Sequence, residues 1–249
     1  MSESPVYVRG GTPEFLEAFE KARVTFKYFW RELSWEHRRI IPGLDLACVK
    51  VAFRQENPPG DPIVEYMWIS DVDFDGVQVT GTLINDPDEL TNVSSGDSVQ
   101  ISWSEICDWM FAINRKVYGG YTIQVIRAGL PKKDRKAHDK AWGLDFGGLD
   151  NVMVAYEQDK HPENLIEHPM CRNMGDSFRD FLTQHPTEVT QCDEDGYTML
   201  HRQAIAGNRG TIEILLELGA DPHARTTSGY TAGDFASALG WDHLVPLLS

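Results

Sequence analysis

Cysteine, long apolar runs and export signals are the features that this sequence has least of. Its four cysteines, Cys48, Cys107, Cys171 and Cys192, lie far apart and form no Cys-x-x-Cys pair, so zinc sites and disulfide frameworks are disfavoured. No stretch approaches the roughly 18 apolar residues that cross a bilayer. The opening MSESPVYVRGG lacks the basic and apolar segments of a signal peptide. These absences predict a protein of the reducing cytoplasm without membrane contact.

Basic residues are the second scarcity. Lys and Arg total 23 against 38 Asp and Glu, a formal net charge of -15, which opposes binding of nucleic acid and suits a basic partner. Residues 55–114 hold twelve carboxylates and no Lys or Arg, whereas residues 115–140 carry eight basic residues. Either these segments neutralise one another or stay solvated, or the acidic one forms a face that steers a basic partner.

Residues 1–160 predict an α+β domain that consists of a long helix and an antiparallel sheet. The helix is expected to begin at Thr12-Pro13, because Thr is a good N-cap and Pro suits the first turn. Its apolar stripe is Phe15, Phe19, Ala22, Phe26, Phe29 and Leu33. Strand-like runs follow at residues 44–53, 64–72, 77–84, 99–101, 121–127 and 152–156, with a short helix over residues 103–112.

Four motifs in this first domain occur together in a fixed order. They are Glu65-Tyr66-Met67-Trp68, the run Gly81-Thr82-Leu83-Ile84-Asn85-Asp86-Pro87, Gly96-Asp97-Ser98-Val99 and Ile106-Cys107-Asp108-Trp109-Met110. With them, residues 20–130 resemble the YegJ-like family, a bacterial domain of undetermined function. The resemblance implies a fold and a bacterial source, and it implies no activity.

Residues 163–249 predict a second, all-α domain. Gly196-Tyr197-Thr198 recurs 33 residues later as Gly229-Tyr230-Thr231, and the residues between them resemble the ankyrin repeat. His201 is expected to hydrogen-bond with Thr198 in the turn, whereas the second copy carries Asp234 at the place of that histidine. With a degenerate helix pair over residues 168–183, the array holds one clear and two degenerate repeats. An array that short should lean on the first domain.

The sequence offers little that predicts catalysis or a bound metal. Residues 71–76 match the first half of a calcium-binding EF-hand loop, but its twelfth position is Thr82, so a polar turn is favoured. Cys107 stands beside Asp108 on the predicted helix and is expected to be buried and inert. His161, His168 and His185 lack the spacing of metal ligands. We therefore expect no catalytic residues, no metal, no cofactor and no enzyme.

Acidic composition, a helper domain and ankyrin repeats together predict a cytoplasmic immunity protein. By analogy of architecture, such an antitoxin would inhibit by direct binding a basic toxin, with a nuclease favoured, of the kind used in bacterial competition and type VI secretion. Other binding roles, and an enzyme whose repeats recruit its substrate, are the alternatives. The residues expected to contact the partner are the turn carboxylates Asp71, Asp73, Asp75, Asp86, Asp88 and Glu89 and the hairpin tip Asp193, Glu194 and Asp195.

Overall fold

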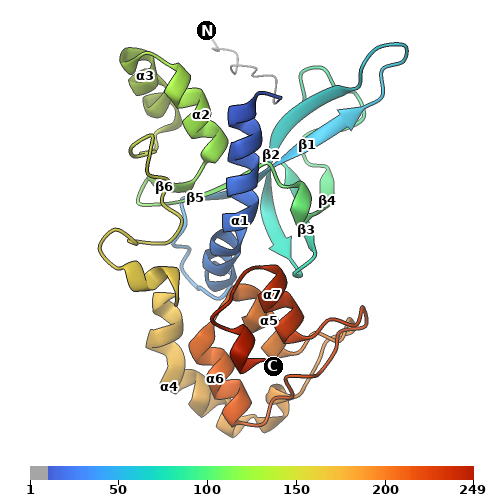
Figure 1. Ribbon diagram of the computed structural model, residues 1–249, viewed down its shortest axis with the longest axis vertical. Helices are drawn as coiled ribbons and strands as arrows, with labels where there is room; N and C mark the ends of the chain where they lie inside the picture. The colour runs from blue at the N-terminus through green and yellow to red at the C-terminus, as the bar shows by residue number, and fades with distance from the viewer. Residues whose placement is uncertain (1–10) are drawn as a thin grey trace. The chain divides into compact units, whose positions relative to one another are not determined.

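The computed structural model describes residues 11–249, and the chain folds into two units (Figure 1). Unit 1 comprises Met1–Thr25, Gly43–Asp73 and Gln78–Met153, and unit 2 comprises Phe26–Pro42, Phe74–Val77 and Val154–Ser249. The domain boundary at residues 160–163 stays a prediction, and the opening ten residues of the expected first domain lie outside the described residues. No helix within residues 11–249 combines the length and the apolar character that crossing a bilayer requires.

Unit 1 is built on a six-stranded sheet with the strand order β4-β3-β2-β1-β5-β6. The pairs β1–β2, β1–β5, β3–β4 and β5–β6 are antiparallel, which confirms the α+β expectation. The strands are β1 (Leu46–Gln55), β2 (Ile63–Phe74), β3 (Gln78–Leu83), β4 (Ser98–Ser102), β5 (Asp108–Ile113) and β6 (Lys116–Gly119).

Helix α1 (Pro13–Glu36) begins where the sequence predicts. The Thr12 carbonyl accepts the N–H groups of Phe15 and Leu16, each at 3.1 Å, and all six residues of the predicted apolar stripe are buried. Residues up to Thr25 belong to unit 1, and the remainder of the helix belongs to unit 2. Within unit 1 the helix is fixed by Trp109 of β5, whose Nε1–H donates to the Ala22 carbonyl at 2.9 Å.

The prediction of a helix over residues 103–112 is wrong. Only Trp103–Glu105 form a short 3-10 helix, which the side chains of Ser102 and Glu105 cap, and Cys107 lies in the loop that follows. The rest of the segment is β5, which pairs with β1 on one side and β6 on the other and is buried along nearly its whole length. A strand that is buried on both faces reads as a nearly continuous apolar run without alternation. Its sequence pattern therefore cannot be distinguished from that of a buried helix.

The strand expected at residues 121–127 is wrong as well, because this segment is helix α2 (Tyr121–Gly129). Its β-branched residues favour a strand. The helix forms because the Asp108 carboxylate of β5 accepts the N–H groups of Tyr121 at 3.0 Å and Thr122 at 2.7 Å. These are N–H groups that a helix leaves without an internal partner, so a residue thirteen positions earlier supplies the cap.

Two further segments of unit 1 differ from expectation. Residues 152–156 form no strand, although the Met153 carbonyl accepts the N–H of Gly119 at 2.8 Å. Helix α3 (Lys132–Trp142), which the sequence did not indicate, carries five of the eight basic residues of segment 115–140. Arg127 of α2 binds Asp139 of α3 at 2.7 Å and so ties the two helices together.

Unit 2 is helical after Val154, as the sequence predicts. Its helices are α4 (Pro169–Gln184), α5 (Met199–Ala206), α6 (Arg209–Glu217) and α7 (Ala232–Ala238), with 3-10 turns at Pro162–Leu165, Pro186–Val189 and Val245–Leu247. The degenerate helix pair expected over residues 168–183 is instead the single helix α4. The helix runs through Gly175, because a single glycine inside a helix costs only about 1 kcal/mol relative to alanine.

The second half of α1 completes the core of unit 2. Trp35 donates its Nε1–H to Asn208 Oδ1 at 3.1 Å, and Lys27 donates to the Gly240 carbonyl at 2.6 Å. Glu32 and His168 are both buried, and Glu32 Oε2 lies 3.1 Å from His168 Nε2. Polar groups at the ends of α4, α6 and α7 thus find their partners on a helix at the other end of the chain.

Candidate functional site

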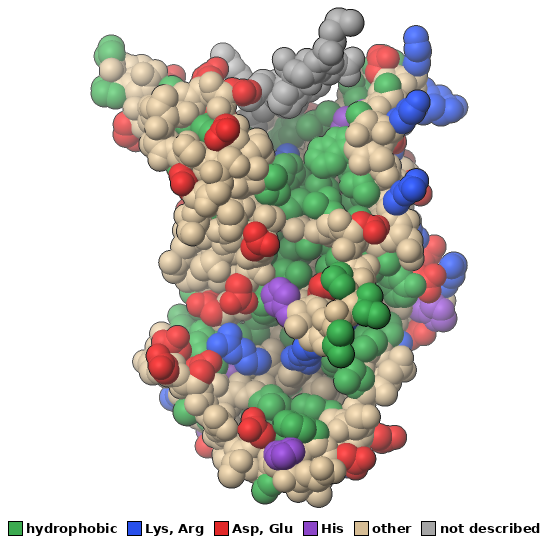
Figure 2. All heavy atoms as spheres, turned by 180° about the vertical axis from the view of Figure 1, so that it is seen from behind, with side chains coloured by type: hydrophobic (Ala, Val, Ile, Leu, Met, Phe, Trp, Pro, Cys, Tyr) green, Lys and Arg blue, Asp and Glu red, His purple; other side chains and the backbone are tan. Residues whose placement is uncertain are grey.

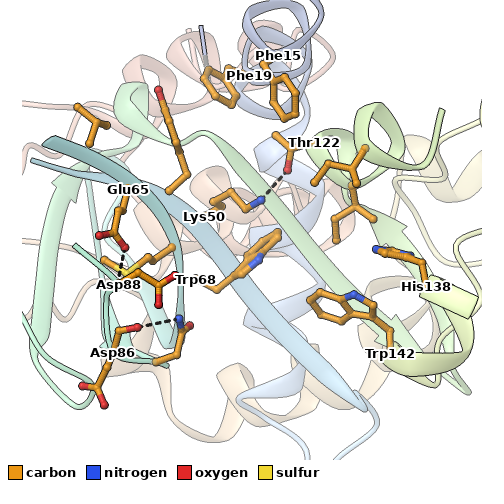
Figure 3. A pocket seen from close by; sticks show the side chains of 16 residues that line it. Phe15, Phe19, Lys50, Glu65, Trp68, Asp86, Asp88, Thr122, His138 and Trp142 are labelled. Carbon is orange, nitrogen blue, oxygen red and sulfur yellow. Dashed lines mark hydrogen bonds between the residues drawn. The ribbon is translucent and has the colours of Figure 1, made fainter. Parts of the chain in front are cut away.

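A hollow of about 430 Å³ opens in unit 1 and is lined from six parts of the chain: α1, β1, β2, the β3–β4 loop, α2 and α3. Six of the sixteen lining residues carry rings, and one of these is Tyr66. Figure 3 shows the other five around the same space: Phe15, Phe19, Trp68, His138 and Trp142. Figure 2 shows hydrophobic side chains gathered in a hollow of unit 1, with Lys and Arg side chains along one side. A concave apolar site of this volume is typical of small-molecule binding.

Lys50 of β1 lies at the floor of this hollow. In the sheet its neighbours are Trp68 of β2 and Asp108 of β5, so the three side chains stand in one row. Lys50 Nζ donates to Thr122 Oγ1 at 3.0 Å and lies 4.7 Å from the centre of the Trp68 ring. Burial lowers the pKa of the Lys50 ammonium, while the nearby Asp108 carboxylate opposes that shift.

Asp108 stands beside Lys50 on the neighbouring strand β5 and is fully buried. Besides the Tyr121 and Thr122 N–H groups, it accepts the N–H of Trp109 at 2.8 Å and the Thr122 hydroxyl at 2.6 Å. Burial raises the pKa of Asp108, whereas Lys50 and these hydrogen bonds lower it. Lys50, Thr122 and Asp108 therefore form a continuous hydrogen-bonded chain from the hollow into the core.

Glu65 of β2 positions one rim of the hollow. Its carboxylate accepts the backbone N–H groups of Asp88 at 3.0 Å, Glu89 at 2.6 Å and Leu90 at 2.9 Å. Burial opposes the ionised form, yet the three donors hold the pKa of Glu65 below its usual value. The β3–β4 loop is therefore tied to the sheet, and its side chains Asp86 and Asp88 line the rim while remaining exposed.

The carboxylates expected in one turn at residues 71–75 are not in one turn. Asp71 and Asp73 lie on β2 with exposed side chains, because the strand runs on to Phe74. Asp75 alone belongs to the turn, where its Oδ1 accepts the Val77 N–H at 2.7 Å. The expected polar turn is therefore shorter than predicted, since alternating buried residues extend the strand. Within the described residues 11–249, no group of three His, Cys, Asp or Glu could hold a metal ion.

The second predicted carboxylate cluster, Asp193 to Asp195, occupies one hairpin of unit 2, and all three residues are exposed. Asp193 accepts the N–H groups of Asp195 at 3.1 Å and Tyr197 at 2.8 Å and pairs with Arg202 at 2.7 Å. Its charge is thus engaged in holding the hairpin. Glu194 and Asp195 are the carboxylates of this cluster that remain for a partner, and their role stays a prediction.

The burial of Cys107 and the hydrogen bonds of His201 agree with what the sequence predicts for these two residues. Cys107 is buried, and burial raises the pKa of its thiol to about 11, while that of Cys171 is raised to about 12. His201 accepts the Thr198 N–H on Nδ1 at 3.1 Å and donates from Nε2 to the Ala224 carbonyl at 3.1 Å. Burial lowers the pKa of His201. Low-pKa, accessible thiolates are the reactive ones, so these two thiols are unsuited to nucleophilic chemistry.

Sequence reasoning missed the hollow and Lys50. One signal was present, because Lys50 interrupts the otherwise apolar run from Leu46 to Phe53. Lys50 lies on a central strand of the sheet and is partly buried, so it needs a counter-charge, and that partner is 58 positions away at Asp108. The distance explains why no local pattern revealed the pair.

Comparison with known proteins places the hollow within a recognised region. Residues 12–146 match the family described as "Uncharacterized protein conserved in bacteria (DUF2314)". The chain belongs to this family. The uncharacterized protein YegJ of Escherichia coli is 37% identical over 70 residues, which are 28% of this chain and 46% of YegJ, so the YegJ-like resemblance is confirmed. The DUF2314 region contains every residue named above as lining the hollow.

Two further relatives match this chain, one over its whole length and one over part of it. A Neisseria meningitidis serogroup B protein with the words "ankyrin repeat protein" in its name is 50% identical over 249 residues, covering 100% of this chain and 98% of that protein. Human ankyrin repeat domain-containing protein 49 is 36% identical over 70 residues, 28% of this chain and 29% of that protein. No solved structure matches the chain.

Proposed function

We propose that the chain is a protein-binding inhibitor in which the helices of unit 2 form an ankyrin-type array that holds the partner. The supporting observation is a cap that repeats with the 33-residue period. Thr198 accepts the N–H of the residue three positions on, and Thr231 does the same at the start of α7. Gly207 and Gly240, again 33 residues apart, have φ values of 72° and 69° at or beside the helix ends.

The array also presents exposed hairpins of the kind that repeat proteins offer to partners. The two hairpins that precede α5 and α7 are linked by a hydrogen bond from the Thr227 N–H to the Asp195 carbonyl at 2.8 Å. This bond fixes the backbone beside Glu194, whose carboxylate is exposed. A rigid backbone with an exposed acidic tip suits recognition of a basic protein surface.

We propose further that the partner is a basic toxin, with a nuclease favoured, and that the chain acts as its immunity protein by binding and without catalysis. A net charge of -15 supports attraction to a basic partner. The alternative, an enzyme, is supported by Lys50, whose lowered pKa is a property of catalytic lysines. Binding is favoured because Thr122 and Asp108 account for that lysine as part of a structural chain.

The test is co-expression of the chain with the toxin encoded beside its gene, followed by measurement of cell survival and association rate. Glu194→Lys reverses an exposed charge at the hairpin tip, and Asp176→Lys reverses one on the exposed surface of α4 as the matched control. Electrostatic steering predicts association about tenfold slower for the first variant at low salt, with the difference shrinking at high salt.

Equal association rates for both variants would contradict contact at the hairpin tip. A neighbouring gene that encodes no toxin, or cells that the chain fails to protect, would contradict the immunity role itself. Circular dichroism of each variant verifies that the fold is intact, as expected for exposed charges.

A further inference from the structure

The charges around the hollow of unit 1 are unevenly distributed. Among the sixteen described residues that line it, Lys50 is the sole Lys or Arg, and it sits on the floor. The acidic residues lie at one rim. Glu65 is engaged by three backbone donors, and Asp86 accepts the Ser95 N–H at 2.9 Å. Asp86 and Asp88 are exposed to water and act weakly over distance, and the buried Glu65 already has three backbone donors, whereas the Lys50 charge inside the lined hollow is less screened. The floor therefore governs which charge the hollow accepts.

The ammonium of Lys50 keeps hydrogen-bonding capacity for a bound group. The Thr122 hydroxyl donates to Asp108, so it accepts from Lys50 and uses one of the three ammonium N–H groups. Asp108 is not exposed to the hollow, since it is fully buried and accepts four hydrogen bonds. The Trp68 ring beside the ammonium further holds the charge in place. An anionic group that enters the hollow meets a preorganised cation.

The walls indicate what should accompany that anionic group. Phe15, Phe19 and Trp68 are arranged around the floor (Figure 3), and Tyr66 also lines the hollow. Trp142 stands at the mouth and is 42% exposed. Val64, 36% exposed, adds further uncovered apolar surface. Flat rings favour stacked or edge-on contacts with another ring, and the volume of about 430 Å³ admits a small molecule with such a ring.

We propose that the hollow of unit 1 binds a small aromatic carboxylate, with the carboxylate on Lys50 and the ring between the aromatic walls. This site is independent of the partner-binding role assigned to unit 2. A charge-assisted hydrogen bond to Lys50 supplies selectivity for the acid, and burial of the ring supplies most of the affinity. Such a ligand would also cover the exposed faces of Trp142 and Val64.

The test needs no variant in its first arm. Isothermal titration calorimetry of the full chain compares 3-(2-naphthyl)propionate with its amide and with 3-(2-naphthyl)propylamine, three probes that share a ring and differ in charge. We expect the acid to bind at least tenfold more tightly than the amide, and the amine to bind more weakly than both. Equal affinity for acid and amide, tighter binding of the amine, or no binding of any probe would overturn the proposal.

Three substitutions locate the site. Trp142→Ala should weaken binding of the acid about tenfold, whereas Phe181→Ala, which removes a ring that is 44% exposed on unit 2, should leave it unchanged. Lys50→Gln should abolish the preference for the acid over the amide while leaving amide binding in place. Lys50 also neutralises Asp108, so the binding result for Lys50→Gln is interpreted only if the circular dichroism spectrum of that variant is native. If the spectrum is not native, the comparison of Trp142→Ala with Phe181→Ala decides whether the site is assigned correctly. Equal losses in that pair would overturn the assignment of the site.

Discussion

Units 1 and 2 differ in how they satisfy their polar groups. In unit 1, a few buried carboxylates each serve several distant backbone groups: Glu65 holds the β3–β4 loop, and Asp108 caps α2 while neutralising Lys50. In unit 2, small local caps recur, as at Thr198 and Thr231. Removing one anchor from unit 1 should therefore disturb several elements at once, whereas removing one cap from unit 2 should weaken one helix end.

Helix α1 qualifies this contrast, because it supplies non-local anchors to both units. Trp109 donates to its first half within unit 1, and Trp35 on its second half donates to Asn208 within unit 2. The local caps of unit 2 are thus not sufficient for its fold. A short helical array buries its end faces on neighbours, and here residues 26–42 are part of that burial.

The largest effect should follow from removing the Asp108 carboxylate. Asp108→Ala leaves Lys50 without a counter-charge and three N–H groups without an acceptor, so we expect a loss of about 3–5 kcal/mol in stability. Asp108→Asn, which keeps one acceptor oxygen, should cost less. Urea unfolding followed by fluorescence measures both changes. A loss below about 1 kcal/mol for Asp108→Ala would show that unit 1 has no such central anchor.

In unit 2 a comparable effect requires an apolar residue. Leu215→Ala should cost about 2–5 kcal/mol, because Leu215 is fully buried and its loss leaves a cavity. Leu216→Ala on the same helix is the matched control and should cost less, since Leu216 is partly exposed. Urea unfolding again gives the difference. Equal costs for both variants would show that the packing face of α6 is misassigned.

A smaller effect tests the part that α1 plays in unit 2. Trp35→Phe keeps a ring but removes the N–H that Asn208 accepts, and Asn208 is fully buried, so we expect a loss of about 1–3 kcal/mol. Trp30→Phe, also on α1 and buried, is the control. Thermal unfolding compares the two. A Trp30 variant as destabilised as the Trp35 variant would mean that lost ring volume, and not the hydrogen bond, accounts for the effect.

The sequence predicts the parts of the fold that depend on local contacts better than the parts that depend on distant ones. The 33-residue repeat in the sequence predicted the helices around residues 196–231 of unit 2. The hydrogen bond between Thr198 and His201 was predictable as well, because the two residues are only three positions apart. The stripe of α1 was likewise visible, because its residues recur at helical spacing. Both signals are local, and both are confirmed by the positions of the helices.

The errors in unit 1 have non-local causes. The segment at residues 121–127 forms a helix because Asp108 caps it from another strand, and the segment at residues 108–113 forms a strand because it is paired on both sides. The hollow escaped prediction for the same reason, since its lining comes from six separate parts of the chain. Single-sequence patterns carry no information on such pairings.

The smallest predicted effect is a change in the thermal stability of unit 2 with pH. Burial lowers the pKa of His201 and of His243, so each has a folded-state pKa below its unfolded value of about 6.5. The unfolded chain then takes up protons first, and stability present above pH ~6.5 is lost as the pH falls below it. The thermal midpoint should therefore drop by a few degrees between pH 7 and pH 5.5, and drop less in His243→Gln. A midpoint that rises over this interval would contradict this assignment.

The central claim, that unit 2 holds a protein partner through its hairpins, can be tested at Cys192. This cysteine is exposed next to Asp193, whereas Cys48, Cys107 and Cys171 are buried and burial raises the pKa of each of their thiols. Iodoacetamide should therefore modify one thiol per native chain, and the rate at Cys192 reports on the hairpin alone. With the toxin bound, we expect that rate to fall at least tenfold. An unchanged rate in a complex verified by gel filtration would contradict partner contact at this hairpin.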